Sequence, residues 1–260
     1  MAGRAGAARR VAPGCLTMDL RGRVAIVTGA GRRVGRALAL ALGARGMRVA
    51  VHYNGSRGGA DETCRMIRES GSEAEPFQAD LSDGAAPARL VDDVVHRFGA
   101  LDVLVNSAAV MERTPFGEVT PEQWDAMFAL NLRAPFFVAQ AAARAMAERG
   151  GAIVNIADLA AFETWPAYVP HGITKSGIVH MTRSLARVLA PRIRVNGIAP
   201  GTVLLPDDWD GDSAEHLRAT TPLQRQGSPA DVAGAMLYLL DADYVTGETI
   251  IVDGGRHVRR

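Results

Sequence analysis

The stretch from Val24 to Leu42, VAIVTGAGRRVGRALALAL, predicts the fold of this chain. Its first four residues form a short apolar run typical of a buried parallel strand, and the apolar residues near its end recur at helical spacing. Gly29, Gly31 and Gly35 permit a tight turn, a close approach of the backbone to a ligand, and close packing of the helix on the strand. Free amides at such a helix start bind phosphate, so we expect a dinucleotide site rather than a plain structural turn.

Length and composition fit one α/β domain. The chain has 260 residues and a formal net charge of +1, and a chain of that size buries about 75% of its unfolded surface. The low net charge gives no electrostatic case for nucleic acid as the main partner. Cys15 and Cys64 lack metal or disulfide spacing, and no apolar run reaches the ~18 residues of a membrane span. We expect a cytoplasmic protein without a metal or a membrane anchor.

The first 17 residues, MAGRAGAARRVAPGCLT, show no usable periodicity. We expect residues 1–17 to be a disordered extension and residues 18–260 to form the domain. An Arg-rich, acid-free start is also typical of an organelle transit peptide, but this one is short and nearly free of Ser, and Met18 is an alternative initiator.

From Gly46 onward, strand-like and helix-like segments alternate. This alternation predicts a single doubly wound α/β domain of the Rossmann type, with about seven parallel strands in the order 3-2-1-4-5-6-7 and helices on both faces. After the first strand, the expected strands are Arg48–Tyr53, Ala74–Ala79, Leu101–Val105, Gly151–Ile156, Ile193–Asn196 and Thr249–Val252. Helices are expected from Pro121, over Pro135–Glu148 and over Pro229–Leu240, whereas the acidic stretch after Gly201 has little pattern.

The end of the second strand indicates which dinucleotide binds. A site for NAD usually has an acidic residue there, roughly twenty residues past the glycines, to bind the ribose hydroxyls. This chain reads His52-Tyr53-Asn54-Gly55-Ser56-Arg57 instead. The missing carboxylate, together with Arg33, Ser56 and Arg57, favours the 2′-phosphate of NADP, because guanidinium groups pair well with phosphate oxygens. The alternative is that these arginines are only solvated surface.

Polar and small residues follow the later strands. Asp80 follows the third strand, where it contacts adenine or caps the next helix. The small residues of Asn106-Ser107-Ala108-Ala109 suit a backbone that passes close to a cofactor. Asp158 leaves the carboxyl end of the fifth strand, where open α/β sheets bind their ligands.

Two further sites carry polar residues in helical patterns. His171 and Lys175 are four residues apart and therefore share a helix face, beside an apolar stripe of Ile178, Met181, Leu185 and Val188. Asn131 lies between two leucines, as a satisfied core amide or as part of the site.

In combination, these residues resemble the short-chain dehydrogenases/reductases over about residues 20–258. The family's TGxxxGxG motif matches Thr28–Gly35 apart from Arg33, its NNAG motif loosely matches Asn106–Ala109, and its structural Asn matches Asn131. Pro200-Gly201-Thr202 and Asp253-Gly254-Gly255 are similar to its later signatures. The resemblance implies a nicotinamide cofactor and a homodimer or homotetramer built on helices at 121–149 and 166–189.

Several residues also resemble the pteridine reductase branch of that family. Arg33 at the second motif glycine, Asp158 in place of the usual catalytic Ser, the pair His52-Tyr53 with Ser56, and the ending Gly254-Gly255-Arg256-His257 all resemble it. The chain departs from the branch where Met111 replaces a pterin-stacking aromatic residue and Ala109 replaces a pterin-contacting Ser.

The family's YxxxK motif is altered. The residue four before Lys175 is His171, and the nearest tyrosine, Tyr168, stands three positions earlier. Asp158 and His171 keep the family's spacing between the Ser and Tyr positions, so we interpret His171 as a replacement for the catalytic Tyr.

The resemblance assigns residues to the site. The implied catalytic residues are Asp158, His171, Lys175 and Asn131, and the implied substrate contacts are Ala109, Met111, Asp158 and Tyr168. The implied contacts of NADP are Thr28, Gly29, Gly31, Arg33, Val34, Gly35, Tyr53, Asn54, Ser56, Arg57, Asp80, Leu81, Asn106, Ser107, Ala108, Lys175, Pro200, Gly201 and Thr202.

Two functions follow as hypotheses. The first is an NADPH-dependent oxidoreductase that transfers hydride to a carbonyl or imine of a small substrate, with a pterin-like ring among the candidates. The second is an NADP-binding protein of the same fold that lost turnover when Tyr became His171, and that has a regulatory or binding role.

Overall fold

The chain forms a single parallel sheet flanked by helices. A computed structural model describes residues 18–204 and 211–258. Seven parallel strands lie in the order β3-β2-β1-β4-β5-β6-β7, which confirms the predicted doubly wound sheet. The strand order reverses between β1 and β4, and ligands bind outside the carboxyl ends of the strands at such a point.

The strands match the predicted segments, with differences at their ends. They are β1 Val24–Val27, β2 Arg48–Tyr53, β3 Ala74–Gln78, β4 Val103–Asn106, β5 Gly151–Ile156, β6 Ile193–Pro200 and β7 Thr249–Val252. The predicted Leu101–Val105 was wrong at both ends, because β4 pairs with its neighbours from Val103 through Asn106. The predicted end of β6 at Asn196 was also wrong, since pairing with β5 and β7 continues it to Pro200.

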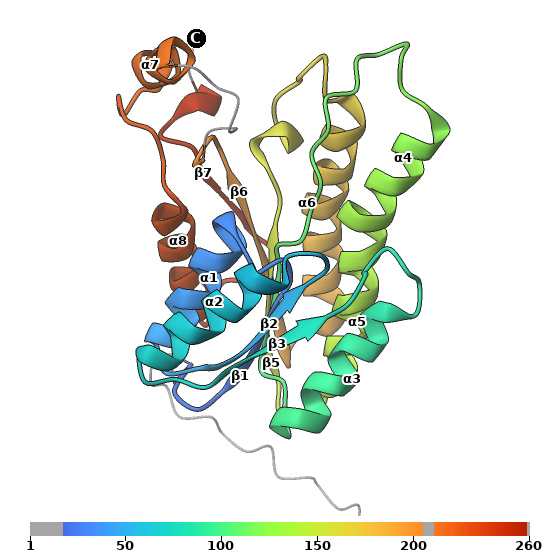
Figure 1. Cartoon of the computed structure of the whole chain (residues 1–260), viewed down its shortest axis with the longest axis vertical. Coiled ribbons are helices and arrows are strands. Elements are labelled where there is room, and N and C mark those ends of the chain that lie inside the picture. The colour runs from blue at the N-terminus through green and yellow to red at the C-terminus, as the bar shows by residue number, and fades with distance from the viewer. Residues whose placement is uncertain (1–17, 205–210, 259–260) are drawn as a thin grey trace, which may run out of the picture.

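Helices cover both faces of the sheet. They are α1 Arg33–Ala44, α2 Arg57–Glu69, α3 Ala86–Phe98, α4 Pro121–Phe128, α5 Ala134–Ala145, α6 Val169–Leu189, α7 Gly211–Thr220 and α8 Pro229–Asp241. Three short turns complete them: the π-helix η1 Ala129–Arg133 and the 3-10 helices η2 Leu159–Ala161 and η3 Arg256–Val258. In Figure 1, α1, α2 and α8 lie on one side of the sheet, and α3, α5 and α6 lie on the other.

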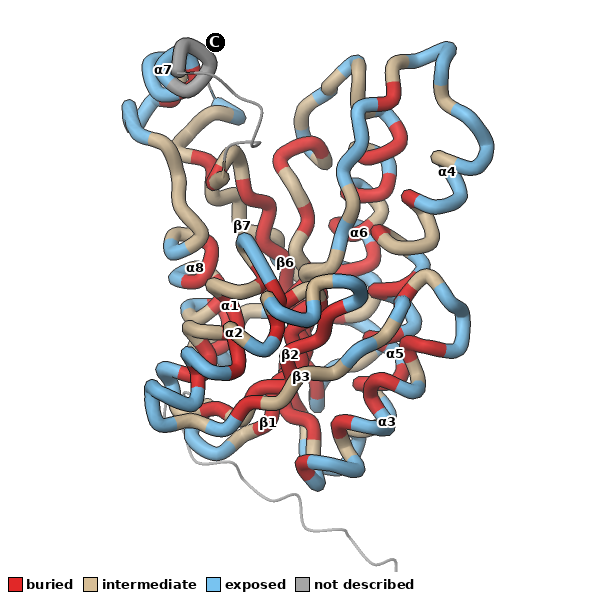
Figure 2. The backbone as a smooth tube through the Cα atoms, in the orientation of Figure 1, coloured by how far each residue is buried: buried red, intermediate tan, exposed pale blue. Residues whose placement is uncertain are grey.

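The central strand explains why the deciding stretch reads as an unbroken apolar run. Ala25 and Val27 pack in the cluster that includes residues of α1 and α8, whereas Val24 and Ile26 pack in the cluster that includes α3 and α5. A strand buried on both faces has no solvent side, so it carries no polar alternation. Figure 2 shows the buried residues concentrated along the strands and the inward sides of the helices.

Several local expectations were wrong. The helix expected to continue to Glu148 ends at Ala145, and α7 lies within the stretch that showed little pattern. Val188 is 73% exposed and does not belong to the buried stripe of α6. Asp80 does not cap α3, whose N-cap residue is Ala85. The predicted extension at residues 1–17 lies outside the described residues.

One helical run of the described residues, Pro121–Ala145, has the length and composition that a membrane span requires. It combines α4, η1 and α5. In this fold α5 packs against α3 and β4, and the core helices of globular proteins meet the same test.

Candidate functional site

The turn between β1 and α1 has no room for side chains at its glycines. Gly29 has a φ of +68°, and a Cβ there would lie 2.9 Å from the Cα of Ala108. A Cβ on Gly35 would lie 2.2 Å from the carbonyl oxygen of Gly29, so α1 packs directly on the turn. Arg32, the N-cap residue of α1, makes no side-chain cap hydrogen bond, and the first turn of α1 carries no acidic residue. The free backbone amides in the first turn of α1 therefore suit the pyrophosphate of a dinucleotide.

Thr28 connects this turn to the end of β4. Its hydroxyl oxygen accepts hydrogen bonds from the amides of Ser107 at 2.9 Å and Ala108 at 3.0 Å. The structure thus brings three of the predicted cofactor contacts together at one edge of the sheet. The buried side chain of Asn106 points along the sheet instead, where its Nδ2 donates to Oδ1 of Asn155 at 2.9 Å.

Three side chains of neighbouring elements hold the turn, and the motif analysis missed all three in this role. The Nδ1 atom of His52 accepts the amide hydrogen of Gly29 at 3.0 Å. Arg36 Nη2 donates to the carbonyl of Gly31 at 2.8 Å, and the hydroxyl of Thr63 lies 3.1 Å from the carbonyl of Ala30. The bonds of His52 and Thr63 join residues far apart in the sequence, so no local pattern predicts them.

The start of α2 lies against the glycine turn. A Cβ on Gly31 would lie 3.1 Å from the carbonyl oxygen of Ser56, the N-cap residue of α2. The next residue, Arg57, is exposed, and its Nε is 3.8 Å from the carboxylate of Asp61. The other predicted contacts on β2 are a buried Tyr53 and, just after it, Asn54.

Arg33 occupies the motif position where the family has glycine, and the backbone explains the family's preference. Its φ is +51°, in the left-handed region. That conformation costs a non-glycine residue about 1–2 kcal/mol. Arg33 therefore stands at this position despite the conformational cost of its positive φ.

The remaining predicted cofactor contacts also lie at strand ends. Asp80 is exposed, and hydrogen bonds from the hydroxyl and amide of Ser82 hold the pKa of its carboxyl below the usual value. Leu81 is buried beside it. Pro200 is the last residue of β6. A Cβ on the following Gly201 would lie 2.7 Å from the Cβ of Asp253, so the backbone before Thr202 packs closely against Asp253.

The predicted catalytic residues lie together beyond the end of β5. His171 is 2% exposed, and its Nε2 lies 3.8 Å from Oδ2 of Asp158. That distance is too long for a hydrogen bond, and neither ring nitrogen of His171 has a hydrogen-bond partner. The other carboxylate oxygen of Asp158 accepts the amide hydrogen of Ala160 at 2.8 Å, which fixes the carboxylate.

Lys175 lies one helical turn after His171, as the spacing predicts. Its Nζ donates to the carbonyl of Ile156, at the end of β5, at 3.0 Å. Burial lowers the pKa of Lys175 from its ordinary value, and the nearby carboxylate of Asp158 opposes that shift. The part of the chain that the structure describes holds no group of three His, Cys, Asp or Glu residues suited to a metal ion.

Asn131 fixes the backbone that leads to the substrate side. It lies in the π-helix η1 and is buried. Its amide accepts from the nitrogen of Val110 and donates to the oxygen of Val110, both at 2.8 Å. Asn131 thus orders the local backbone between Ala109 and Met111, two predicted substrate contacts that are both exposed.

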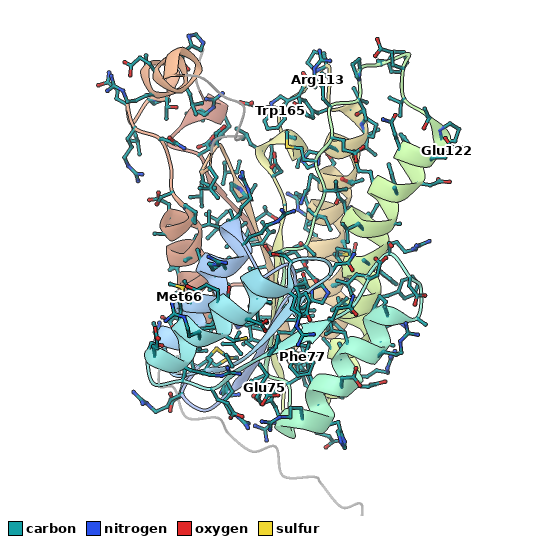
Figure 3. All side chains as sticks on the ribbon, viewed as in Figure 1. Met66, Glu75, Phe77, Arg113, Glu122 and Trp165 are labelled. Carbon is teal, nitrogen blue, oxygen red and sulfur yellow. The ribbon has the colours of Figure 1, made fainter. Side chains whose placement is uncertain are left out.

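The loops after β4 and β5 are joined above this edge. The amide of Thr114 donates to the carbonyl of Ala167 at 2.7 Å, beside Tyr168, the N-cap residue of α6. The ring of Tyr168 meets that of Trp165 edge-on, with centroids 6.2 Å apart. Figure 3 places Arg113 and Trp165 of these two loops at the same end of the molecule.

A family model described as "Enoyl-(Acyl carrier protein) reductase" matches residues 29–257. The 3-oxoacyl-[acyl-carrier-protein] reductase FabG of Staphylococcus aureus is 34% identical over 240 residues, which cover 90% of this chain and 98% of the relative. The chain belongs to the short-chain dehydrogenase/reductase family. It is therefore an oxidoreductase of a family that uses nicotinamide cofactors.

Solved structures of this family match the fold closely. FolM alternative dihydrofolate reductase 1 from Brucella canis, complexed with NADP, has a TM-score of 0.88 and 31% identity, covering 93% of this chain and 96% of that chain. A dehydrogenase/reductase from Sinorhizobium meliloti 1021 has a TM-score of 0.87 and 33% identity, covering 93% of this chain and 98% of that chain.

Proposed function

We propose that this short-chain dehydrogenase/reductase is an NADPH-dependent reductase of a carbonyl or imine group in a small substrate, with His171 at the position of the family's tyrosine. The observation that carries the proposal is the buried imidazole of His171, whose two nitrogens lack hydrogen-bond partners beside Asp158. Leaving a buried polar group unpaired costs about 1–3 kcal/mol. A substrate atom that receives the proton would satisfy that ring.

The chemistry requires an acid at this place. When bound, NADPH supplies the hydride, and the acceptor group is left with negative charge on its oxygen or nitrogen, which a positioned acid must neutralise. An imidazole titrates near neutrality without assistance, unlike a phenol, which needs its pKa lowered. In this proposal His171 delivers the proton, the carboxylate of Asp158 lies beside it, and Lys175 holds the nicotinamide ribose.

The substrate class follows from the same carboxylate. Asp158 lies beside the acid position, where it favours a group that becomes positive on protonation, such as a ring imine. The Brucella canis neighbour is described as an alternative dihydrofolate reductase, which supports a pterin-like ring as one candidate. We therefore expect weak activity on ordinary ketones and higher activity on ring imines. Quinones are a further candidate class that the same assay includes.

The acid is tested by kcat between pH 5 and 10 for the wild type and for His171→Phe, His171→Tyr and Asp158→Ser. Loss of the acid should change both the rate and its dependence on pH. His171→Phe should lower kcat by about 100-fold or more, the usual contribution of a positioned acid. His96→Phe, at an exposed position of α3, is the control and should leave the profile unchanged.

An unchanged rate and pH profile in His171→Phe would show that His171 is no acid. Turnover that occurs in His171→Tyr alone, with no substrate reduced by the wild type, would establish the alternative function of an NADP-binding protein without catalysis.

The proposed preference for NADPH over NADH is based on the charged groups expected to lie near the 2′ position of the adenosine ribose. Arg33, Ser56 and Arg57 lie at the starts of α1 and α2, and the chain has no carboxylate between Tyr53 and Arg57. Each charge-assisted hydrogen bond to a 2′-phosphate contributes about 1.5–3 kcal/mol, so one or two contacts give tenfold to hundredfold discrimination or more.

The variant Arg33→Gly separates binding from backbone strain. It should raise the free energy of unfolding of the protein without dinucleotide by up to about 1 kcal/mol, because glycine adopts a positive φ without penalty. It should also reduce the ratio of NADH to NADPH dissociation constants about tenfold, as should Arg57→Ala. Urea unfolding and fluorescence titration measure the two effects, and Arg68→Ala, at the exposed far end of α2, is the control. Equal affinities of the wild type for both dinucleotides would contradict the assignment.

We also propose that the protein is a cytoplasmic homodimer or homotetramer built on α4, α5 and α6. These helices border a hollow of about 810 Å³ whose lining includes Leu132, Phe136, Phe137 and Met181. Phe136 and Phe137 are exposed, and a second copy of the chain would bury them.

Light scattering at micromolar concentration should show a dimer or tetramer, and Phe137→Glu should convert it to monomer. Phe116→Glu, an equally apolar but more exposed loop position, is the control. A wild-type protein that is only monomeric at that concentration would contradict this part of the proposal.

A further inference from the structure

His52 is a buried histidine on β2, and each of its ring nitrogens makes a hydrogen bond. Its Nδ1 accepts the amide hydrogen of Gly29 at 3.0 Å, and its Nε2 lies 3.0 Å from the carbonyl oxygen of Ala79. A ring nitrogen that bonds to a carbonyl must carry the proton, and one that accepts from an amide must not. The two partners therefore select the neutral ring with its proton on Nε2.

The protein environment keeps this ring neutral. Burial lowers the pKa of His52 to about 4, because the imidazolium form is poorly solvated there, and the bond to Ala79 only partly opposes the shift. At neutral pH the Nδ1 lone pair is thus always available to Gly29.

The ring connects two segments that are expected to contact different parts of the dinucleotide. Gly29 belongs to the turn that faces the pyrophosphate, and Ala79 directly precedes Asp80 at the predicted adenine end. The backbone of β2 reinforces the link, since the carbonyl of His52 accepts from the amide of Ala30 at 2.8 Å and the carbonyl of Tyr53 accepts from the amide of Ala79 at 3.0 Å. One side chain therefore spans the carboxyl ends of β1, β2 and β3.

The orientation of the Gly29 peptide depends on this acceptor. Glycine at a φ of +68° has the greatest backbone freedom of any residue. Arg36 and Thr63 hold carbonyl oxygens of the turn, whereas His52 holds the amide of Gly29. Without the ring nitrogen, that amide would lose its partner or turn toward another, and the adjoining peptides would turn with it.

We propose that His52 is a positioning residue of the dinucleotide site, whose neutral ring fixes the glycine turn relative to the Ala79–Asp80 strand end, so that affinity depends on its hydrogen bonds and not on its bulk. This inference goes beyond the proposed function, because it concerns whichever nicotinamide dinucleotide the protein binds.

The test compares substitutions that separate hydrogen bonding from packing. His52→Asn keeps an acceptor near the place of Nδ1, whereas His52→Leu fills similar space without an acceptor. The matched control is Asn196→Leu. Asn196 is buried on β6, where it donates to the carbonyl of Val245 at 2.8 Å and accepts from the amide of Glu248 at 3.1 Å, which is the same pair of bonds away from the turn.

Dissociation constants for NADPH and NADH are measured by fluorescence titration, together with urea unfolding of each variant. His52→Leu should weaken both dinucleotides about tenfold or more without changing their ratio, as expected for the loss of a hydrogen bond that orders a turn. His52→Asn should stay within about threefold of the wild type, and Asn196→Leu should lose stability with unchanged affinity.

A second readout reports the neutral ring directly. The unfolded chain takes up a proton on this histidine below about pH 6.5, whereas the folded protein excludes it down to about pH 4. The wild type should therefore lose stability relative to His52→Asn as pH falls from 6.5 to 4, and the difference should be constant above 6.5.

Three results would overturn the proposal. The first is a dissociation constant of His52→Leu within twofold of the wild-type value. The others are a dissociation constant of His52→Asn as high as that of His52→Leu, or one of Asn196→Leu raised as much as that of His52→Leu. If His52→Leu fails to fold, His52→Gln replaces it, because its longer amide reaches the place of Nε2 and leaves Gly29 without the acceptor. His52→Gln should then bind at least tenfold more weakly than His52→Asn, and equal affinity of the two would contradict the inference.

Discussion

The close approach of α1 to the end of β1 is the constraint on which the rest of the site depends. Neither Gly29 nor Gly35 leaves space for a Cβ, because atoms of Ala108 and of the turn itself already occupy it. This packing aims the uncapped start of α1 at the carboxyl edge of the sheet. It also brings Thr28 within hydrogen-bonding distance of the segment after β4. The start of α1 and the loop after β4 therefore share one edge of the sheet.

Around that edge, the polar groups differ in how firmly they are held. Asp158 is fixed by the amide of Ala160, Lys175 by the carbonyl of Ile156, and Asn131 by both backbone groups of Val110. The ring of His171 is buried among them without a hydrogen bond. His171 therefore differs from its three neighbours, because its side chain alone among these four has no hydrogen bond within the described structure.

The sequence predicted the sheet well because parallel strands buried on both faces read as apolar runs, as in Val24–Val27 and Gly151–Ile156. Strand ends were less predictable, since Pro200 is in β6 only through its pairing with Val252. The exposure of Val188 and the helix α7 depend on tertiary surroundings that helical spacing does not describe. Motif spacing predicted that Asp158, His171 and Lys175 lie close together, and the structure places them beyond the end of β5. Spacing did not predict the bonds of His52, Arg36 and Thr63 to the glycine turn, which depend on the register of β2 and the placement of α2.

Hydride transfer is the most direct test of the central claim that this chain is a reductase in which His171 is the proton donor. The protein is incubated with NADPH or NADH that carries deuterium at both C4 positions of the nicotinamide and with a panel of ketones, ring imines and dihydropterins, and the products are examined by mass spectrometry. Quinones are tested in parallel by oxidation of the dinucleotide, because deuterium on a hydroquinone oxygen exchanges with water. We expect one carbon-bound deuterium per product molecule for at least one imine, formed faster from NADPH. Binding of the dinucleotide without deuterium in any product and without oxidation by any quinone would contradict the account.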